Sequence, residues 1–480
     1  MDCMTELNFL SVHEALKEIQ NGRLAPHALT EACLHQIQRL NPKLNAFITV
    51  CDEVRAAKPS PMNEEMAPPQ RTRPATLAPG AGASVTLRSI PFAVKDLFET
   101  RGIRTTAGSL FFKDYVPDED ATVIQKLKAS GAIILGKTNT HEIALGVTTV
   151  NPHFGATHNP WDTTRIAGGS SGGSAVAVAT GMSLAALGTD TGGSIRIPAS
   201  LCGVVGLKPT YGQVSLRGVI PLSWNLDHVG PITRTVRDAA LVLQIIAGFD
   251  PQDPASINRA LRDYPGRLED KIKGKKMALA VGSYVEGADT EVIAAINETA
   301  KVFASLGAKI EKVEMDFLRE AALANGLMTQ ADAAAYHRER LAQHPDWFGA
   351  DVRLRLEAGR QTSATEYSLA RHTQAEMKLR LAQFFEEYDH LLLPTTPIAA
   401  PAIEGHDAVE QARRLTRFTA PFNLTGLPAI SIPCGFSKEG LPVGLQIVAG
   451  AWNESGILSA AYAYEQETDG SQRQPSIVRQ

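Results

Sequence analysis

Cysteine is scarce in this chain, and the few that occur lie far apart. The 480 residues contain five, with no Cys-x-x-Cys pair among them: Cys3, Cys33, Cys51, Cys202 and Cys434. An odd, dispersed set of this kind argues against a disulfide framework. A reducing compartment fits this usage best, and we expect a cytoplasmic protein.

Long apolar runs and a large excess of charge are also missing. The longest apolar stretches, such as 175–179, fall far short of the roughly 18 residues of a membrane-spanning helix. The N-terminus lacks the basic and apolar regions of a signal peptide. The formal net charge is only −4, so no overall positive field recruits nucleic acid or anionic lipid. We therefore expect neither a nucleic-acid partner nor a membrane partner.

What is present is a globular composition and a regular alternation of patterns. Hydrophobic residues make up 44% of the chain and charged residues 20%, as in a protein with a sizeable core. A helix is predicted over 26–40, ended by Asn41-Pro42. From 89 to about 250, short apolar stretches alternate with helical patterns such as the small-residue segment 174–187. This alternation implies a largely parallel or mixed sheet covered by helices.

Two glycine- and serine-rich segments stand out within the alternating region. Residues 168–174 are Gly-Gly-Ser-Ser-Gly-Gly-Ser, and residues 188–198 are Gly-Thr-Asp-Thr-Gly-Gly-Ser-Ile-Arg-Ile-Pro. Glycine allows positive φ and the close approach of another group. A serine at the end of such a turn exposes its hydroxyl beside free N–H groups, which an oxyanion hole requires.

The first segment alone is open to four interpretations. A phosphate-binding loop would need Gly-Lys-Ser/Thr at its end, and no lysine is present. A flexible linker is disfavoured by the helical pattern that follows at once. Residues 168–172 also fit the Gly-x-Ser-x-Gly nucleophile elbow, but the polar segment before them is not the buried strand that an elbow needs. The fourth interpretation takes both segments together as one site.

A serine nucleophile needs a base within hydrogen-bond reach, and a neutral lysine can act as one. Lys95 is the candidate, because it ends the apolar stretch 90–95, where a lone lysine is otherwise rare. Its ordinary pKa of about 10.4 would have to fall by about 2 to 3 units, and burial lowers the pKa of a lysine. On the local sequence alone, a lysine that emerges at the strand end and pairs with Asp96 is the favoured interpretation.

Together with Ile-Pro-Phe-Ala-Val-Lys-Asp at 90–96, the two segments resemble the amidase signature family. Further ordered matches extend the resemblance along most of the chain, at 135–139, 154–161, 203–210, 226–231, 393–397 and 423–428. The resemblance implies an α/β amidase signature fold, a large mixed β-sheet covered on both sides by helices. One departure lies at 84–89, where the family's frequent Gly-x-Leu-x-Gly is absent, which puts the local loop shape in doubt.

The resemblance also implies a Ser-cisSer-Lys triad and an acyl-enzyme intermediate. Ser194 would attack the acyl carbon, Ser170 in a cis peptide would shuttle the proton, and Lys95 would be the ultimate base and acid. The N–H groups of the oxyanion hole would belong to Thr191, Gly192, Gly193 and Ser194. The side chains that orient this loop would be Ser171, Asp190 and Arg196. No metal and no other cofactor is implied.

A single amidase signature domain over 1–480 follows from the same resemblance. Its sections would be the N-terminal helices (1–57), a Pro- and Ala-rich loop (58–88), the catalytic core (89–250), a mainly helical section (251–400), and C-terminal strands with a helix that complete the sheet (401–480).

The leading functional prediction is a free-standing amidase that cleaves a small linear amide, with anilides, esters or carbamates as further substrates. Ala144, Leu145 and Gly146 match the loop that borders the acyl pocket in relatives. Their small, apolar character suggests an uncharged substrate, although ordinary loop packing explains it equally well. Trp224 is a candidate for the pocket entrance. The expected partner is the small-molecule substrate, and a homodimer is compatible with the sequence.

The sequence leaves two alternative functions open. A non-catalytic scaffold is disfavoured because all three triad positions are intact. The glutaminase subunit of a Glu-tRNA(Gln)/Asp-tRNA(Asn) amidotransferase resembles the chain over the same segments. That enzyme has an aspartate where this chain has Thr416, and a buried ammonium needs a partner. An arginine for the glutamine carboxylate is available at Arg353 or Arg355. The missing acid makes the glutaminase the less favoured interpretation.

Overall fold

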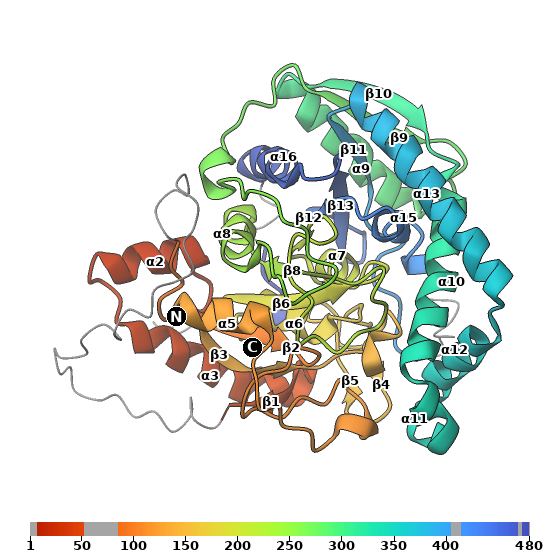
Figure 1. Ribbon diagram of the computed structural model, residues 1–480. Coiled ribbons are helices and arrows are strands. Elements are labelled where there is room, and N and C mark those ends of the chain that lie inside the picture. The colour runs from red at the N-terminus through yellow and green to blue at the C-terminus, as the bar shows by residue number, and fades with distance from the viewer. Residues whose placement is uncertain (1–6, 52–84, 405–413, 469–472, 480) are drawn as a thin grey trace.

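The computed structural model describes residues 7–51, 85–404, 414–468 and 473–479. Most of the predicted Pro- and Ala-rich loop 58–88 lies outside these residues. An eleven-stranded sheet runs through the molecule in the order β1-β3-β2-β6-β8-β7-β12-β13-β11-β9-β10 (Figure 1). The strands are β1 Phe47–Val50, β2 Pro91–Lys95, β3 Ile133–Thr138, β6 Ala185–Asp190, β7 Val205–Lys208, β8 His228–Thr233, β9 Lys276–Val281, β10 Lys309–Glu314, β11 His390–Pro394, β12 Ala429–Phe436 and β13 Pro442–Val448.

The sheet is mixed, as the sequence predicts. Strand β2 runs parallel to both β3 and β6, whereas β6 and β8 are antiparallel. Parallel pairing returns at the other end, where β9 lies between β11 and β10. A separate two-stranded hairpin joins β4 Val150–Asn151 to β5 Gly155–Ala156.

Helices flank this sheet, which confirms the predicted fold class. Helices α6 and α7 contact the sheet and each other, while α5, α8, α16 and α9 form a second row of successive contacts. The bounds are α2 Val12–Gln20, α3 Pro26–Leu44, α5 Thr122–Ala129, α6 Gly172–Ala179, α7 Arg196–Cys202, α8 Val236–Ile246, α9 Thr290–Ser305, α10 Leu318–Tyr336, α11 Arg338–Gln343, α12 Ala350–Gln361, α13 Ala364–Glu387, α15 Ala420–Leu424 and α16 Glu454–Gln466.

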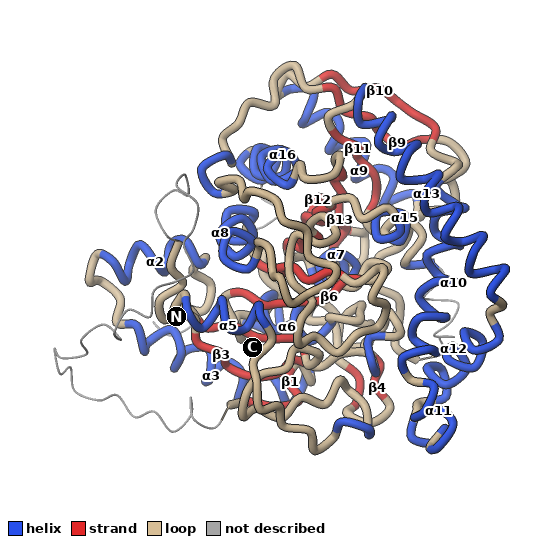
Figure 2. The backbone as a smooth tube through the Cα atoms, viewed as in Figure 1, coloured by secondary structure: helices blue, strands red, loops and turns tan. Residues whose placement is uncertain are grey.

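The long helices of the section 251–400 stand together at one side of the molecule. Figure 2 shows α10, α12 and α13 beside one another, far from α2 and α3. Helix α10 contacts both α12 and α13, and it also contacts α15. Helix α10 therefore connects this outer group to the C-terminal part of the chain.

Two predicted helix boundaries differ from the structure. The small-residue segment 174–187 is not one helix, because α6 ends at Ala179 and residues from Ala185 onward form β6. Gly181, with a φ of +70°, turns the chain between them, and this left-handed conformation does not continue an α-helix. Helix α3 continues past Pro42 to Leu44, and Asn45 ends it in the left-handed conformation.

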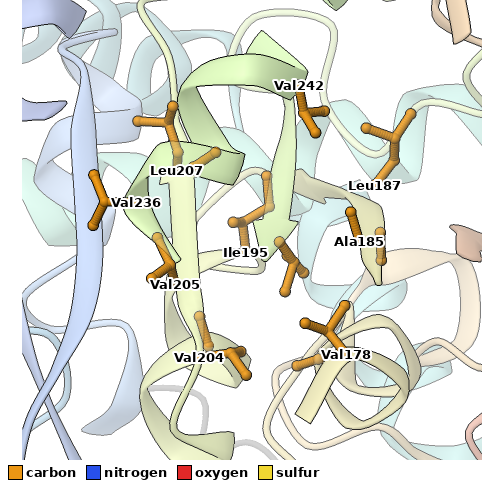
Figure 3. Packing of buried hydrophobic residues seen from close by; sticks show 14 of the residues in the cluster. Val178, Ala185, Leu187, Ile195, Val204, Val205, Leu207, Val236 and Val242 are labelled. Carbon is orange, nitrogen blue, oxygen red and sulfur yellow. The ribbon is translucent and has the colours of Figure 1, made fainter. Parts of the chain in front are cut away.

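The main core lies where the catalytic segments meet the sheet. Figure 3 shows Val178 of α6, Leu187 of β6, Val205 of β7 and Val242 of α8 gathered in one cluster. Each of these side chains is fully buried. Because the strands and helices that carry the glycine-serine segments belong to this core, those segments are held on a rigid frame. None of the helices in the described part of the chain has the length and apolar character needed to cross a lipid bilayer.

The N-terminal helix is attached to this frame by one buried carboxylate. The Asp238 side chain of α8 accepts the backbone N–H groups of Val12 and His13, each at 2.9 Å. A capping box between Ser11 and Glu14 occupies further N–H groups of the first turn. Burial raises the pKa of Asp238, and the hydrogen bonds from α2 oppose that rise.

Replacing Asp238 with alanine should therefore loosen α2. The Asp238→Ala variant leaves two N–H groups without their acceptor, and we expect a loss of about 1–3 kcal/mol in the free energy of unfolding. Urea denaturation measures that loss, and hydrogen exchange should show faster exchange at residues 12–15. The exposed Asp270→Ala variant is the matched control. Equal stability of the two variants would show that the carboxylate does not hold α2.

Candidate active site

Lys95 ends strand β2 and is fully buried. Its Nζ lies 2.7 Å from the hydroxyl of Ser170 and 2.7 Å from the hydroxyl of Thr189, and donates to both. The neighbouring Asp96 does not take this ammonium; it pairs instead with Lys137 at 3.3 Å. The interpretation of Lys95 as a surface lysine paired with Asp96 therefore does not describe the structure.

This environment shifts the protonation of Lys95. Burial lowers its pKa to about 7, while the negative charges of Asp227 and Asp190 act in the opposite direction. Because its two hydrogen-bond partners are neutral hydroxyls, no carboxylate in contact holds it in the charged form. Near neutral pH, a large fraction of this amine is free to accept a proton.

The two serines of the predicted triad occupy different surroundings. Ser194 lines a cavity of about 830 Å³, whereas Ser170 is fully buried behind it and contacts Lys95. The Ser171 N–H donates to the Ser194 carbonyl at 3.2 Å, which holds the two segments together. The peptide bond between Gly169 and Ser170 is cis. This placement supports Ser194 as the residue that meets the substrate and Ser170 as the link to the lysine.

The predicted oxyanion loop offers fewer N–H groups than the sequence suggests. The Gly193 N–H already donates to the Asp190 carboxylate at 2.7 Å. Within the described residues, the N–H groups of Thr191, Gly192 and Ser194 have no hydrogen-bond acceptor. These three residues also line the cavity. They are the donors available to a developing negative charge on the substrate oxygen.

Asp190 and Arg196 form a buried ion pair behind the loop. The Arg196 Nη2 donates to Asp190 Oδ1 at 2.9 Å, and both side chains are fully buried. Burial alone would raise the pKa of Asp190, but the charge of Arg196 and its hydrogen bonds outweigh it and lower the pKa. Arg196 also donates to Gln446 and Asn423, so the pair is fully hydrogen-bonded, as a buried charge requires.

The predicted pocket residues are only partly brought together. Ala144, Leu145 and Gly146 line the cavity that contains Ser194. Trp224 does not, because it lines a neighbouring cavity of about 580 Å³ between α10, α12 and α13. Its side chain is 46% exposed.

The cavity wall carries positive charge, of which the sequence indicates only Arg355 as a candidate. Four arginines line it: Arg319, Arg355, Arg414 and Arg417. Among its described lining residues there is no aspartate or glutamate. Arg319, Arg414 and Arg417 lie in segments that no motif singles out, so the sequence does not indicate them. A substrate with an anionic group fits this wall better than the uncharged one predicted from residues 144–146.

Several further residues of the site are not singled out by the sequence, although Thr189 and Asp227 lie inside segments that carry the family resemblance. Thr189 contacts Lys95, and Asp227 accepts the Thr191 hydroxyl at 2.5 Å. Asn325 of α10 donates to the Thr191 carbonyl at 3.1 Å, and Thr419 donates to the Gly192 carbonyl at 2.6 Å. Asn325 and Thr419 act on the loop backbone from outside the loop, so only the folded chain reveals their contacts.

The pKa of Lys95 predicts the pH dependence of the reaction. Only the neutral amine accepts a proton, and its pKa is lowered to about 7, so kcat/KM should rise as pH increases through about 7 and level off above it. Measurements of kcat/KM from pH 5 to 9 test this rising part of the pH profile. The Lys95→Ala variant should retain little activity and lose this rise. A profile that is flat over the whole range would exclude a lysine base.

A fluorophosphonate distinguishes the two serines. It should label Ser194, which lines the cavity, and the Ser194→Ala variant should remain folded but unlabelled, since a serine nucleophile forms the covalent adduct. Peptide mass spectrometry locates the label, and thermal unfolding checks the fold. Labelling at Ser170 in the unmutated enzyme would contradict the arrangement.

Comparisons with known proteins agree with this geometry. A family model described as Amidase matches residues 28–458. A glutamyl-tRNA(Gln) amidotransferase subunit of Geobacter sp. (strain M21) is 38% identical, over 96% of this chain and 98% of the relative. The structure of the subunit with the same name from Thermotoga maritima has a TM-score of 0.81 at 35% identity and covers 98% of this chain and 96% of its own. A chain from a vestigial complex, linked to the origins of an s-triazine catabolic enzyme, has a TM-score of 0.84 at 31% identity, over 95% and 98%.

These similarities correct two predictions made from the sequence. The free-standing amidase for small linear amides is wrong, because relatives that match over nearly the full length are named as an amidotransferase subunit. The expectation of a small-molecule partner without nucleic acid is wrong for the same reason, since that name includes glutamyl-tRNA. The same catalytic segments can attack any amide, so they do not distinguish a free-standing amidase from an amidotransferase subunit. Net charge describes only the overall field of the chain, so it does not distinguish them either.

The family match covers most of the chain, and the relatives match it from end to end. The buried lysine contacts Ser170, and Ser194 lines the cavity beside loop N–H groups that have no acceptor among the described residues. The chain belongs to the amidase signature family and is an enzyme that hydrolyses the carbon–nitrogen bond of amides.

Proposed function

We propose that this chain is the glutaminase subunit of a glutamyl-tRNA(Gln) amidotransferase, and that it releases ammonia from glutamine. The observation that carries the proposal is the similarity to subunits of that amidotransferase, with 36–38% identity over at least 96% of the chain. A full-length match at this level includes the walls of the site as well as its catalytic segments. The proposed organisation is a single domain over 1–480, working with partner subunits in the cytoplasm.

The first half of the reaction follows from the triad. Neutral Lys95 takes the proton of Ser170, Ser170 takes that of Ser194, and the Ser194 oxygen bonds to the amide carbon. The negative charge that develops on the amide oxygen meets the N–H groups of the loop 191–194. The proton then returns from Lys95 through Ser170 to the leaving nitrogen, and the C–N bond breaks. Ammonia leaves, and an ester of Ser194 remains.

Water completes the cycle by the same proton path. Lys95, neutral again, accepts a proton through Ser170 from the water that attacks the ester carbon. The proton next passes to the Ser194 oxygen as the ester bond breaks, which releases glutamate and restores the enzyme. Each proton that Lys95 takes up is returned within the same half-reaction, so the lysine is charged only transiently inside its buried site.

Arg355 is the candidate for binding the glutamine carboxylate. It lines the cavity and is 7% exposed, and its Nη1 donates to the Leu145 carbonyl at 3.1 Å. Arg353, the other candidate from the sequence, does not line the cavity, and its side chain is 44% exposed beside Glu357. A guanidinium matches a carboxylate in shape and charge.

The glutamine ammonium has neutral acceptors in the described part of the cavity. Asn325, Gln330 and Thr416 line it, and each carries a side-chain oxygen. Neutral oxygens can accept the ammonium hydrogen bonds in the absence of the aspartate, although with less electrostatic gain. The threonine at 416 therefore changes the strength of ammonium recognition without removing every partner.

A glutaminase assay with the partner subunits tests the proposal. Ammonia release from L-glutamine should occur in the assembled complex, and Arg355→Ala should raise KM about tenfold or more while kcat changes little, because a carboxylate contact is lost. The matched control is Arg353→Ala on the same helix. Complexes that ignore glutamine but hydrolyse hexanamide would contradict the proposal, and so would equal effects of the two substitutions.

A further inference from the structure

The carbonyl groups of the oxyanion loop are held by donors from three elements: α7, α10 and α15 with its N-cap residue. The Asp190 carbonyl accepts Asn423 Nδ2 at 2.8 Å, and the Gly193 carbonyl accepts the Ile197 N–H at 2.7 Å. The Gly192 carbonyl accepts the Thr419 hydroxyl, and the Thr191 carbonyl accepts Asn325 Nδ2. Each peptide plane of the loop is thus fixed from outside.

Fixing a carbonyl also fixes the N–H that follows it. A trans peptide is planar, so the C=O of one residue and the N–H of the next point in opposite directions. The Asn325 hydrogen bond to the Thr191 carbonyl therefore determines where the Gly192 N–H points. Gly192 lines the cavity, and its N–H has no acceptor among the described residues. This N–H is therefore available to a substrate oxygen in the cavity.

Asn325 differs from the other donors in its position. It lies on α10, is 3% exposed and lines the substrate cavity itself. A Cβ placed on Gly192 would come within 3.3 Å of Asn325 Oδ1, so the side chain packs directly against the loop. Asp227 also contacts Thr191, but it accepts a hydrogen bond from the side-chain hydroxyl, at 2.5 Å, and does not contact the Thr191 carbonyl. Among the described residues, the peptide plane between Thr191 and Gly192 is therefore oriented by the hydrogen bond from Asn325.

The loop needs such a restraint because its glycines provide none. Gly192 and Gly193 have no side chains to limit their torsions, and Gly193 has a φ of +134°. An N–H that is not held in position must be reoriented during the reaction. This reorientation costs free energy, so the oxyanion hole stabilises the transition state less.

We propose that Asn325 is a positioning residue for the oxyanion hole: its amide orients the Gly192 N–H toward the acyl oxygen and couples the hole to helix α10. The role rests on the proposed function only in that Ser194 is the nucleophile. It does not depend on glutamine being the substrate. Asn325 acts through the loop, so its removal should slow the covalent step more than it weakens binding.

Inactivation of Ser194 by a fluorophosphonate in the full chain tests this role without the natural substrate. Asn325→Ala should lower the maximal inactivation rate kinact about 10- to 100-fold, below the roughly 10²- to 10³-fold effect of removing an oxyanion donor outright. The half-saturating concentration KI should change less than about threefold. The exposed Asn297→Ala on α9 is the chemically matched control, and its kinact should equal that of the unmutated enzyme.

A second variant tests the same role if Asn325→Ala does not fold. Asn325→Asp keeps the size of the side chain but places a carboxylate oxygen opposite the Thr191 carbonyl, so it should lower kinact at least as much. Unchanged kinact in both variants, or a change in KI alone, would overturn the positioning role. If the unmutated enzyme itself is not labelled at Ser194, the nucleophile assignment falls together with this role. An absence of glutaminase activity with normal labelling would count only against the proposed function.

Discussion

A fully buried lysine whose nearest partners are hydroxyl groups is the constraint on which the site depends. Lys95 donates to Ser170 and Thr189, and burial lowers its pKa to about 7. A carboxylate in direct contact would hold the charge and remove the base. The fold avoids this because Asp96 forms an ion pair with Lys137, and Asp190 forms an ion pair with Arg196. These two acids are paired with other cations, and Asp227 accepts the Thr191 hydroxyl, so no carboxylate contacts Lys95 directly.

The rest of the site is a rigid support for one short loop. Residues 190–194 connect β6 to α7, and both of these elements pack in the core. The Asp190 carboxylate takes the Gly193 N–H and the Arg196 guanidinium, which fixes one side of the loop. Donors from α10 and from the C-terminal part fix the other side. Catalytic geometry in this chain is thus assembled from parts that are more than 200 residues apart in sequence.

The sequence predicts the chemistry of the site better than its selectivity. Lys95, Ser170 and Ser194 lie in continuous segments with distinctive neighbours, so the contact between Lys95 and Ser170 and the place of Ser194 in the cavity agree with the sequence. Asn325, Thr419 and the cavity arginines other than Arg355 lie in segments without such patterns, and only folding brings them to the site. The alternation of patterns predicts the mixed sheet, whereas the positive φ at Gly181 divides a predicted helix into α6 and β6. The threonine at position 416 favours an independent amidase, and the full-length match to amidotransferase subunits contradicts that prediction.

Direct titration of the Lys95 amine tests the central claim most closely. NMR of the protein labelled with ¹⁵N at lysine Nζ reports the protonation of each buried lysine, and the Lys95→Met variant assigns the signal. The structure predicts a midpoint near pH 7. A Lys95 signal that remains that of an ammonium up to about pH 10, the ordinary range of the side chain, would contradict the neutral lysine and with it the proposed proton path.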